Sequence, residues 1–232
     1  MHPIFETRKL SKQYKQIHAL NNLDLILTSG KMVGLLGPNG SGKTTLLKIS
    51  AGLLTPSSGC VLIDGQAPGT ETKKIVSYLP DRMALPTELT AADVIAMYGD
   101  FFQDFDKEKA HDMLKALKLS PAQRIGTMSK GTQEKFQICL TMSRSAKLYL
   151  LDEPLGGVDP AAREYILSTI LRNYSENSTV LFSTHLIGDI EKALDEVVIL
   201  RNGSLILHDS VDHLREEKGM SVDEYFKEVF RC

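Results

Sequence analysis

The segment MVGLLGPNGSGKTTLLKISA, residues 32–51, decides the fold, because a short apolar run, a glycine-rich turn and an apolar helical stretch follow one another in it. The turn fits the pattern G-x-x-x-x-G-K-[ST], whose glycines let several backbone N–H groups point at phosphate oxygens. The following helix presents its positive end to the same place. Lys43 is expected to contact the β- and γ-phosphates, and the Thr44 hydroxyl to ligate Mg²⁺. The segment therefore predicts a site for ATP and Mg²⁺ built from Gly37, Pro38, Asn39, Gly40, Ser41, Gly42, Lys43, Thr44 and Thr45.

An acidic pair follows a second apolar run. Residues 148–151 are all apolar or aromatic, and Asp152 and Glu153 come directly after them. A carboxylate at the end of a buried strand beside the phosphate loop can hold Mg²⁺ through water, which is the role expected for Asp152. Glu153 is placed to orient or deprotonate an attacking water. Such a pair by itself is usually a solvated turn, but in a chain with the glycine-rich loop it indicates nucleotide hydrolysis.

A histidine follows a third apolar strand. His185 comes soon after the strand expected at 179–182. A lone histidine is more often structural than catalytic, but the carboxyl ends of parallel strands meet at one edge, so this side chain can face the same crevice. A neutral imidazole there could contact the γ-phosphate or the water. Glu153 and His185 are therefore the two candidate catalytic residues.

The composition limits the partners. The chain has 232 residues, with 27 Lys and Arg against 29 Asp and Glu, a net charge of −2. This balance lacks the basic excess of a nucleic-acid binder, so no nucleic-acid partner is expected. Cys60, Cys139 and Cys232 are too few and too far apart for a disulfide framework or a metal site, and are expected to be free thiols. No apolar run approaches the ~20 residues of a membrane span, so a cytoplasmic chain is expected, unless a partner holds it at a membrane.

Short apolar strands alternate with helical patterns along most of the chain. Strands are expected at 4–10, 23–27, 32–36, 59–64, 75–79, 148–151, 179–182 and 197–200, and helices at 91–102, 107–119, 131–145 and 161–174. This alternation predicts an α/β fold whose core sheet is mostly parallel and covered on both faces. The stretch 87–146 is predicted to be a helical insertion into a core formed by residues 1–86 and 147–208.

A helical tail is predicted at 209–232. Ser221 and Glu224 fit a capping box that starts a helix. The apolar residues of that helix lie on one face, namely Val222, Tyr225, Phe226, Val229 and Phe230. We expect this stripe to pack on the chain itself rather than on a partner.

Taken together, these motifs resemble the ATP-binding subunit of an ABC transporter over nearly the whole chain. Tyr14 resembles the aromatic residue that stacks on adenine, residues 37–44 the Walker A loop, and residues 148–153 the Walker B strand with its catalytic glutamate. Residues 157–159 resemble the D-loop and His185 the switch histidine. Residues 128–133 stand where the family has its L-S-G-G-Q signature, with Ser129 and Gly131 retained. The resemblance implies a single ABC-type ATPase domain with the P-loop NTPase fold, including an antiparallel β subdomain near the N-terminus.

Two departures from the family pattern are visible. In the signature, Lys130 replaces the first glycine and Thr132 the glutamine, although Ser129 and the N–H groups opening the following helix can still bind a γ-phosphate. The Q-loop glutamine is replaced by Asp81, a shorter residue that only accepts hydrogen bonds. Asp81 is therefore a candidate for contact with Mg²⁺ or water.

The resemblance also implies partners. Two ATPase subunits, identical or different, would face head to tail, with each ATP between the Walker A loop of one and Ser129 of the other. A separate membrane permease would hold the chain at the inner face of the membrane, as in the ABC-2 exporter branch. The segment 78–82, the helical insertion and Phe101, Phe102 and Phe105 form its candidate docking surface, although these phenylalanines favour a core position. The alternative is a soluble ABC ATPase that acts in a cytosolic assembly.

Overall fold

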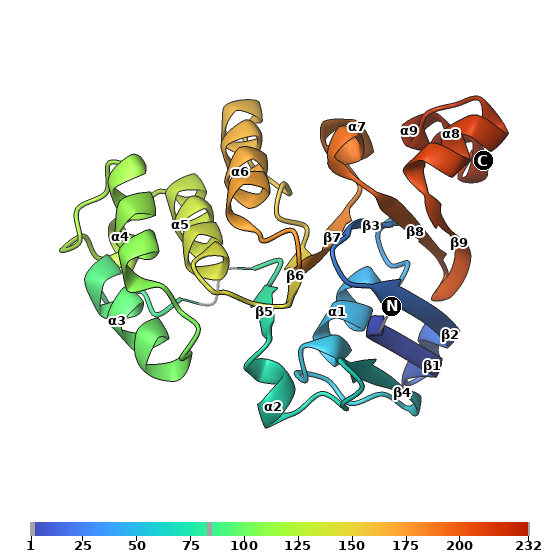
Figure 1. The fold of residues 1–232 in the computed structure, drawn as a ribbon, viewed down its shortest axis with the longest axis horizontal. Coiled ribbons are helices and arrows are strands. Elements are labelled where there is room, and N and C mark those ends of the chain that lie inside the picture. Colours follow the sequence, from blue (N-terminus) through green and yellow to red (C-terminus); the bar gives the residue numbers. More distant parts are fainter. Residues whose placement is uncertain (1–2, 83–84, 232) are drawn as a thin grey trace.

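The computed structural model describes residues 3–82 and 85–231, and a six-stranded sheet lies at its centre (Figure 1). The strand order is β5-β6-β7-β3-β8-β9; the first five run parallel, and the edge strand β9 pairs antiparallel with β8. The strands are β3 Met32–Leu36, β5 Val76–Leu79, β6 Leu148–Asp152, β7 Thr179–Thr184, β8 Glu196–Arg201 and β9 Ser204–Ser210. Every residue of β3, β6 and β7 is buried, which is why each of these strands contains a short continuous apolar run.

A smaller antiparallel sheet lies beside the first, in the order β2-β1-β4. Its strands are β1 Pro3–Tyr14, β2 Ile17–Thr28 and β4 Ser58–Ile63. Alternate residues of the central strands, such as Val33 and Leu181, join the buried side chains of this sheet and of helix α1 in one hydrophobic cluster. Their neighbours Met32 and Phe182 point to the opposite face, into a second cluster. The alternation follows from the two-residue period of a strand, and it gives the sheet a core on each side.

Helices cover the rest of the molecule. They are α1 Lys43–Ser50, α2 Thr70–Lys73, α3 Ala91–Phe101, α4 Lys107–Ala116, α5 Lys130–Met142, α6 Pro160–Asn173, α7 Ile187–Ile190, α8 Val211–Lys218 and α9 Val222–Val229, with 3₁₀ turns at Ile125–Thr127 and Glu191–Ala193. Within the described ranges, 3–82 and 85–231, none of them is long and apolar enough to cross a membrane.

Helices α3, α4 and α5 form an arm at the end of the molecule opposite the termini (Figure 1). The arm has its own hydrophobic cluster, to which Phe105 contributes a buried ring and Phe102 a partly buried one. Phe101 differs, because 76% of its surface is exposed. The expectation of a core position is therefore wrong for Phe101, the last residue of α3.

One buried arginine ties this arm to the central sheet. The guanidinium of Arg144, just after α5, donates to both carboxylate oxygens of Asp104 in the arm. It also donates to the carbonyls of Val76, Lys73 and Lys74, at 2.6, 3.1 and 3.0 Å, where β5 begins. Only 3% of Arg144 is exposed. The arm is therefore held against the strand that leads to Asp81.

In the C-terminal part, the sequence patterns did not predict the edge strand β9, whereas helix α8 lies within the predicted helical tail. The predicted domain boundary at 208/209 falls inside β9. Helix α9 begins at Ser221 with the expected capping box, in which Ser221 Oγ accepts from the N–H of Glu224. Val222 is buried, and Tyr225, Phe226 and Phe230 pack partly buried on the core of the central sheet. The structure thus confirms that the apolar stripe packs on the chain itself.

The described cysteines are free, as expected. Cys139 is buried and Cys60 is half-buried. Burial raises the pKa of the Cys139 thiol to about 12. Cys232 lies outside the described residues.

Candidate nucleotide-hydrolysing site

The glycine-rich loop lies between β3 and α1, at the carboxyl edge of the central sheet. Gly37, Gly40 and Gly42 all have positive φ angles, of 158°, 82° and 106°. At Gly42 the requirement is steric as well, because a Cβ there would lie 2.4 Å from the carbonyl oxygen of Ala19. Of the remaining loop residues, Pro38 and Asn39 are exposed, Ser41 is buried and Thr45 is half-buried in α1. The loop thus has the backbone that the sequence pattern predicts.

Lys43 is almost completely buried at the start of α1, with 5% of its surface exposed. Its ammonium donates to the carbonyl oxygen of Gly37 at 2.8 Å and lies 3.3 Å from Glu153 Oε1. A buried ammonium needs such partners, since an unpaired one is strongly disfavoured. The loop therefore closes around the cation of Lys43 and holds it next to the predicted base.

Asp152 ends strand β6 beside the start of α1. Its Oδ1 accepts hydrogen bonds from Thr44 Oγ1 at 3.0 Å and from Ser183 Oγ at 2.9 Å. Its Oδ2 is buried, and no residue in the described part of the chain donates to it. Burial raises the pKa of Asp152, and the charges of Asp81 and Glu153 raise it further, while the two hydroxyl donors lower it. An anionic carboxylate with a free oxygen in this position matches the needs of a divalent cation.

The residues present therefore fit Mg²⁺. Thr44 offers a hydroxyl oxygen, Asp152 a free carboxylate oxygen, and Asp81 a second carboxylate whose charge acts on Asp152. Hard oxygen ligands of this kind are those that Mg²⁺ prefers. Asp81 itself is exposed in the segment after β5.

Glu153 sits directly after β6 in an unusual backbone conformation, with φ of +49°. Its N–H donates to Ser183 Oγ at 2.9 Å, and its carboxylate lies between Lys43 and His185. The distance from Glu153 Oε2 to Nδ1 of His185 is 2.9 Å. A non-glycine residue with positive φ is held there by its surroundings, and such positions are frequent at functional sites. The candidate base is therefore fixed by contacts on three sides.

Ser183 is a site residue to which the sequence analysis gave no role. Its hydroxyl donates to Asp152 and accepts from the N–H of Glu153, so it joins the two acidic residues. The only sequence signal was its place at the end of β7, two residues before His185.

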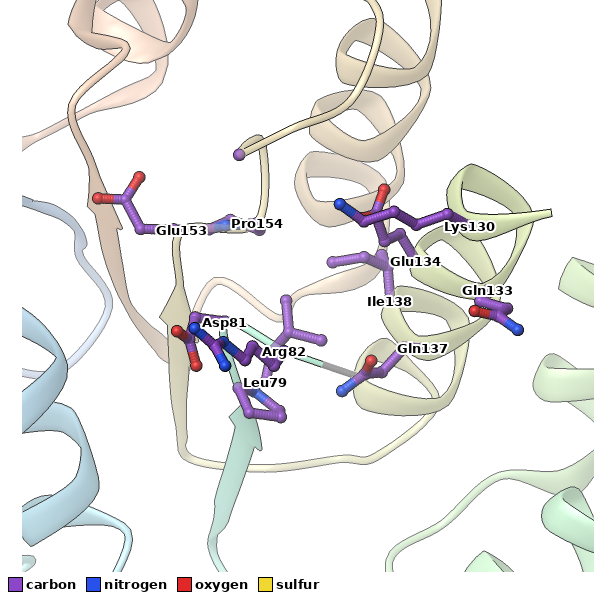
Figure 2. A pocket seen from close by; sticks show the side chains of 12 residues that line it. Leu79, Asp81, Arg82, Lys130, Gln133, Glu134, Gln137, Ile138, Glu153 and Pro154 are labelled. Atoms are coloured by element: carbon purple, nitrogen blue, oxygen red, sulfur yellow. The ribbon is translucent and has the colours of Figure 1, made fainter. Parts of the chain in front are cut away.

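A cleft of about 330 Å³ separates this group from the first turns of α5 (Figure 2). Glu153 lies on one wall, Asp81 and Arg82 on a second, and Lys130 and Glu134 on the third. Burial raises the pKa of Glu134, whose Oε2 lacks a partner among residues 3–82 and 85–231. The cleft thus brings the two departures from the family pattern, Asp81 and Lys130, to one place.

The predicted signature residues lie at the start of α5. Ser129 is the N-cap of the helix and accepts from the N–H of Thr132 at 3.2 Å. A Cβ on Gly131 would meet no atom within 4 Å. In the described parts of the chain, no hydrogen bond or ion pair joins Ser129 or Gly131 to the glycine-rich loop. Tyr14, at the end of β1, is 45% exposed, and the Lys12 ammonium lies 5.2 Å from the centroid of its ring.

Comparisons with known proteins agree with this geometry. The family model described as ABC transporter matches residues 20–156. The SkfA peptide export ATP-binding protein SkfE of Bacillus subtilis (strain 168) is 30% identical over 234 residues, which cover 98% of this chain and 96% of SkfE. A solved ATP-binding subunit of an ABC transporter superimposes with a TM-score of 0.88 at 28% identity, over 98% of this chain and 100% of that one.

A third comparison shows the same fold at lower identity. The dimeric post-hydrolysis state of the ATP-binding cassette MJ0796, bound to ADP and Pi, has a TM-score of 0.78 at 23% identity, over 89% of this chain and 98% of that one. These likenesses confirm the predicted fold class, an α/β ATPase fold with a mostly parallel sheet and a separate antiparallel one.

Proposed function

This chain belongs to the ABC transporter family and is an ATP-binding ATPase of that family, and we propose that it powers export through a separate membrane subunit. Export is favoured by the likeness to SkfE, which is named as a peptide export ATP-binding protein. In this proposal the chain stays at the cytoplasmic face of the membrane through its partner. The observation that supports the chemistry best is the contact of Glu153 with both Lys43 and His185.

The site residues have complementary roles in the proposed reaction, in which ATP and water give ADP and phosphate. The loop N–H groups and Lys43 bind the phosphates. Mg²⁺, held by Thr44, Asp152 and Asp81, supplies positive charge to the phosphate oxygens when it is bound. Glu153 orients the attacking water and accepts its proton.

His185 holds the Glu153 carboxylate through Nδ1 at 2.9 Å, which leaves its other ring nitrogen to face the γ-phosphate. Tyr14 is the proposed stacking partner of adenine. Its ring is exposed at the end of β1, where a flat base can reach it.

The second half of the ATP site comes from another ATPase subunit in this proposal, bound head to tail. Gly131 supports it, because its surroundings are open and its own chain gives no steric reason for a glycine. Space beside a helix N-terminus suits a phosphate brought by a partner. Ser129 caps the same helix, and its hydroxyl lies at that end. Ser129 and Gly131 would thus face the γ-phosphate held by the other subunit.

A groove beside the arm is the proposed docking site of the membrane subunit. It has a volume of about 780 Å³ and lies between α2 and the end of α3. Lys73 and Lys74 line one part, Asp100 and Asp104 another, and the exposed ring of Phe101 lies among them. Met97, Tyr98 and Phe102 line the same groove, and an apolar patch rimmed by charged residues is typical of an interaction surface. The Arg144 guanidinium joins the walls of this groove to β5, which leads to Asp81.

Two variants test the chemistry. Glu153→Gln should abolish most ATP hydrolysis while ATP still binds, so the protein should accumulate as an ATP-bound dimer in size-exclusion chromatography with light scattering. Lys43→Ala should lose nucleotide binding, whereas Lys48→Ala, on the same helix, should bind normally. A normal hydrolysis rate in Glu153→Gln would show that Glu153 is not the base.

Purification from the native host tests the partner. Recovery together with a polytopic membrane protein supports the transport proposal. Recovery solely in soluble complexes would contradict it and favour the cytosolic-assembly alternative.

A further inference from the structure

A buried glutamate joins the segment after His185 to the C-terminal tail. Glu191 follows directly on helix α7 and has only 7% of its surface exposed. Its Oε1 accepts from Arg215 Nη2 at 2.9 Å and from the N–H of Val222 at 3.0 Å, and its Oε2 lies 3.4 Å from the N–H of Asp223. A single carboxylate thus binds the end of α8 and the first N–H groups of α9.

This arrangement is favourable on three grounds. The first N–H groups of a helix have no partner inside the helix and carry its positive end, so an anion there is stabilised. Arg215 balances the buried charge, which would otherwise be costly. Val222 is fully buried beside this contact, so the tail cannot shift without opening the core.

The same short helix is attached at its other side to the loop after Glu153. Arg163 donates to the carbonyl oxygen of Val158 and to Asp189 Oδ2 of α7, each at 3.2 Å. Helix α7 has only four residues, and a helix this short is not stable without tertiary contacts. Its place therefore depends on its buried side chains Ile187 and Ile190 and on these charged contacts at Asp189 and Glu191.

His185 lies two residues before α7, so the position of α7 determines where the imidazole lies relative to Glu153. We infer that Glu191 is a positioning residue for ATP hydrolysis: by binding Arg215 and the start of α9 it fixes α7, and through α7 the imidazole of His185. The C-terminal tail then acts on the rate of hydrolysis without touching nucleotide. This inference rests on the role proposed for His185.

The test combines steady-state ATPase kinetics with amide hydrogen exchange on the full chain. Glu191→Ala and Arg215→Ala should each lower kcat, by about tenfold for Glu191→Ala, because displacing a reacting group by about 1 Å costs up to about a hundredfold. KM for ATP should change little, since neither residue is near the glycine-rich loop. Exchange of the amides of residues 186–190 should become faster in both variants, because α7 opens more often.

Glu224→Ala is the matched control. It removes the carboxylate that accepts from the Ser221 N–H in the capping box at the same helix end, but leaves the contacts of Glu191 intact. Its kcat and the exchange of residues 186–190 should equal those of the unchanged protein. Glu191→Gln keeps an acceptor for the N–H of Val222 but loses the ion pair, so its kcat should lie between those of Glu191→Ala and the unchanged protein.

Unchanged exchange at 186–190 in Arg215→Ala, an exposed position whose replacement leaves the core intact, would overturn the inference. Faster exchange with unchanged kcat would also overturn it, because α7 would then move without consequence for His185. Neither result touches the proposed function, which depends on the behaviour of Glu153→Gln and Lys43→Ala.

Discussion

Arg144 offers the sharpest test of how the arm is attached to the core. In Arg144→Ala, six hydrogen-bond contacts are lost: three to Asp104 and one each to the carbonyls of Val76, Lys73 and Lys74. The guanidinium also stacks on the ring of Phe102, with its carbon 3.9 Å from the centroid.

The magnitude follows from burial. Removing one partner of a buried ion pair costs about 3–5 kcal/mol, because the other charge stays behind without compensation. Asp104 keeps some contact with water, with 20% of its side chain exposed, which lowers this part of the cost. The lost contact with Phe102 adds about 1–2 kcal/mol. We therefore expect Arg144→Ala to lower the free energy of unfolding by about 4 kcal/mol, a large share of the ~5–15 kcal/mol of an ordinary domain.

Urea unfolding followed by circular dichroism measures this loss. Arg144→Lys should lower the free energy of unfolding by about half as much as Arg144→Ala, because an ammonium keeps the charge but cannot reach three segments at once. Arg8→Ala is the control, since Arg8 pairs with Glu6 on the exposed surface and should leave the midpoint unchanged. A loss below about 1 kcal/mol in Arg144→Ala would refute the reasoning, because it would approach the ~0.5 kcal/mol of an ordinary surface substitution.

Two further predictions concern charge. Asp81→Asn should raise the Mg²⁺ concentration needed for half-maximal nucleotide binding by about tenfold, if Asp81 helps to hold the metal beside Asp152, and a titration with fluorescent nucleotide measures it. The hydrogen bond to Asp209 raises the pKa of His213, so this pair stabilises the fold fully below the ordinary histidine pKa and loses its contribution as pH rises through the raised value. His213→Asn should therefore lower the melting temperature at about pH 6 but not at about pH 9, and equal losses at both would contradict the linkage.

Elements with strong local patterns could be predicted from the sequence. Strand β3 was predicted with its observed bounds, because every residue in it is buried and apolar. Strand β9 was missed because it lies at the sheet edge, where its side chains are only half-buried and no clear pattern results. Helix α8 lies within the predicted helical tail, but its own bounds could not be predicted because only Val211 and Leu214 of its eight residues are buried. The secondary structure of segments with such weak patterns depends on tertiary packing rather than on local propensity.

In the candidate site, too, contacts within one motif could be predicted from the sequence, whereas contacts between distant segments could not. Lys43 and Thr44 belong to one contiguous motif, so their proximity could be predicted from spacing. The link from Ser183 to Asp152 spans 31 residues, and that from Arg144 to Val76 spans 68. Such contacts depend on the strand order β5-β6-β7-β3, which a single sequence does not specify.

The contact between Lys43 and Glu153 connects nucleotide binding to the chemistry. In the structure, the Lys43 ammonium forms an ion pair with Glu153 and donates a hydrogen bond to the carbonyl of Gly37. A triphosphate carries more negative charge than one carboxylate, so in the loop it competes successfully for the ammonium. The Glu153 carboxylate then keeps His185 as its partner, and its other oxygen becomes available for water. On this argument, phosphate binding at Lys43 makes the carboxylate of the proposed base available to water.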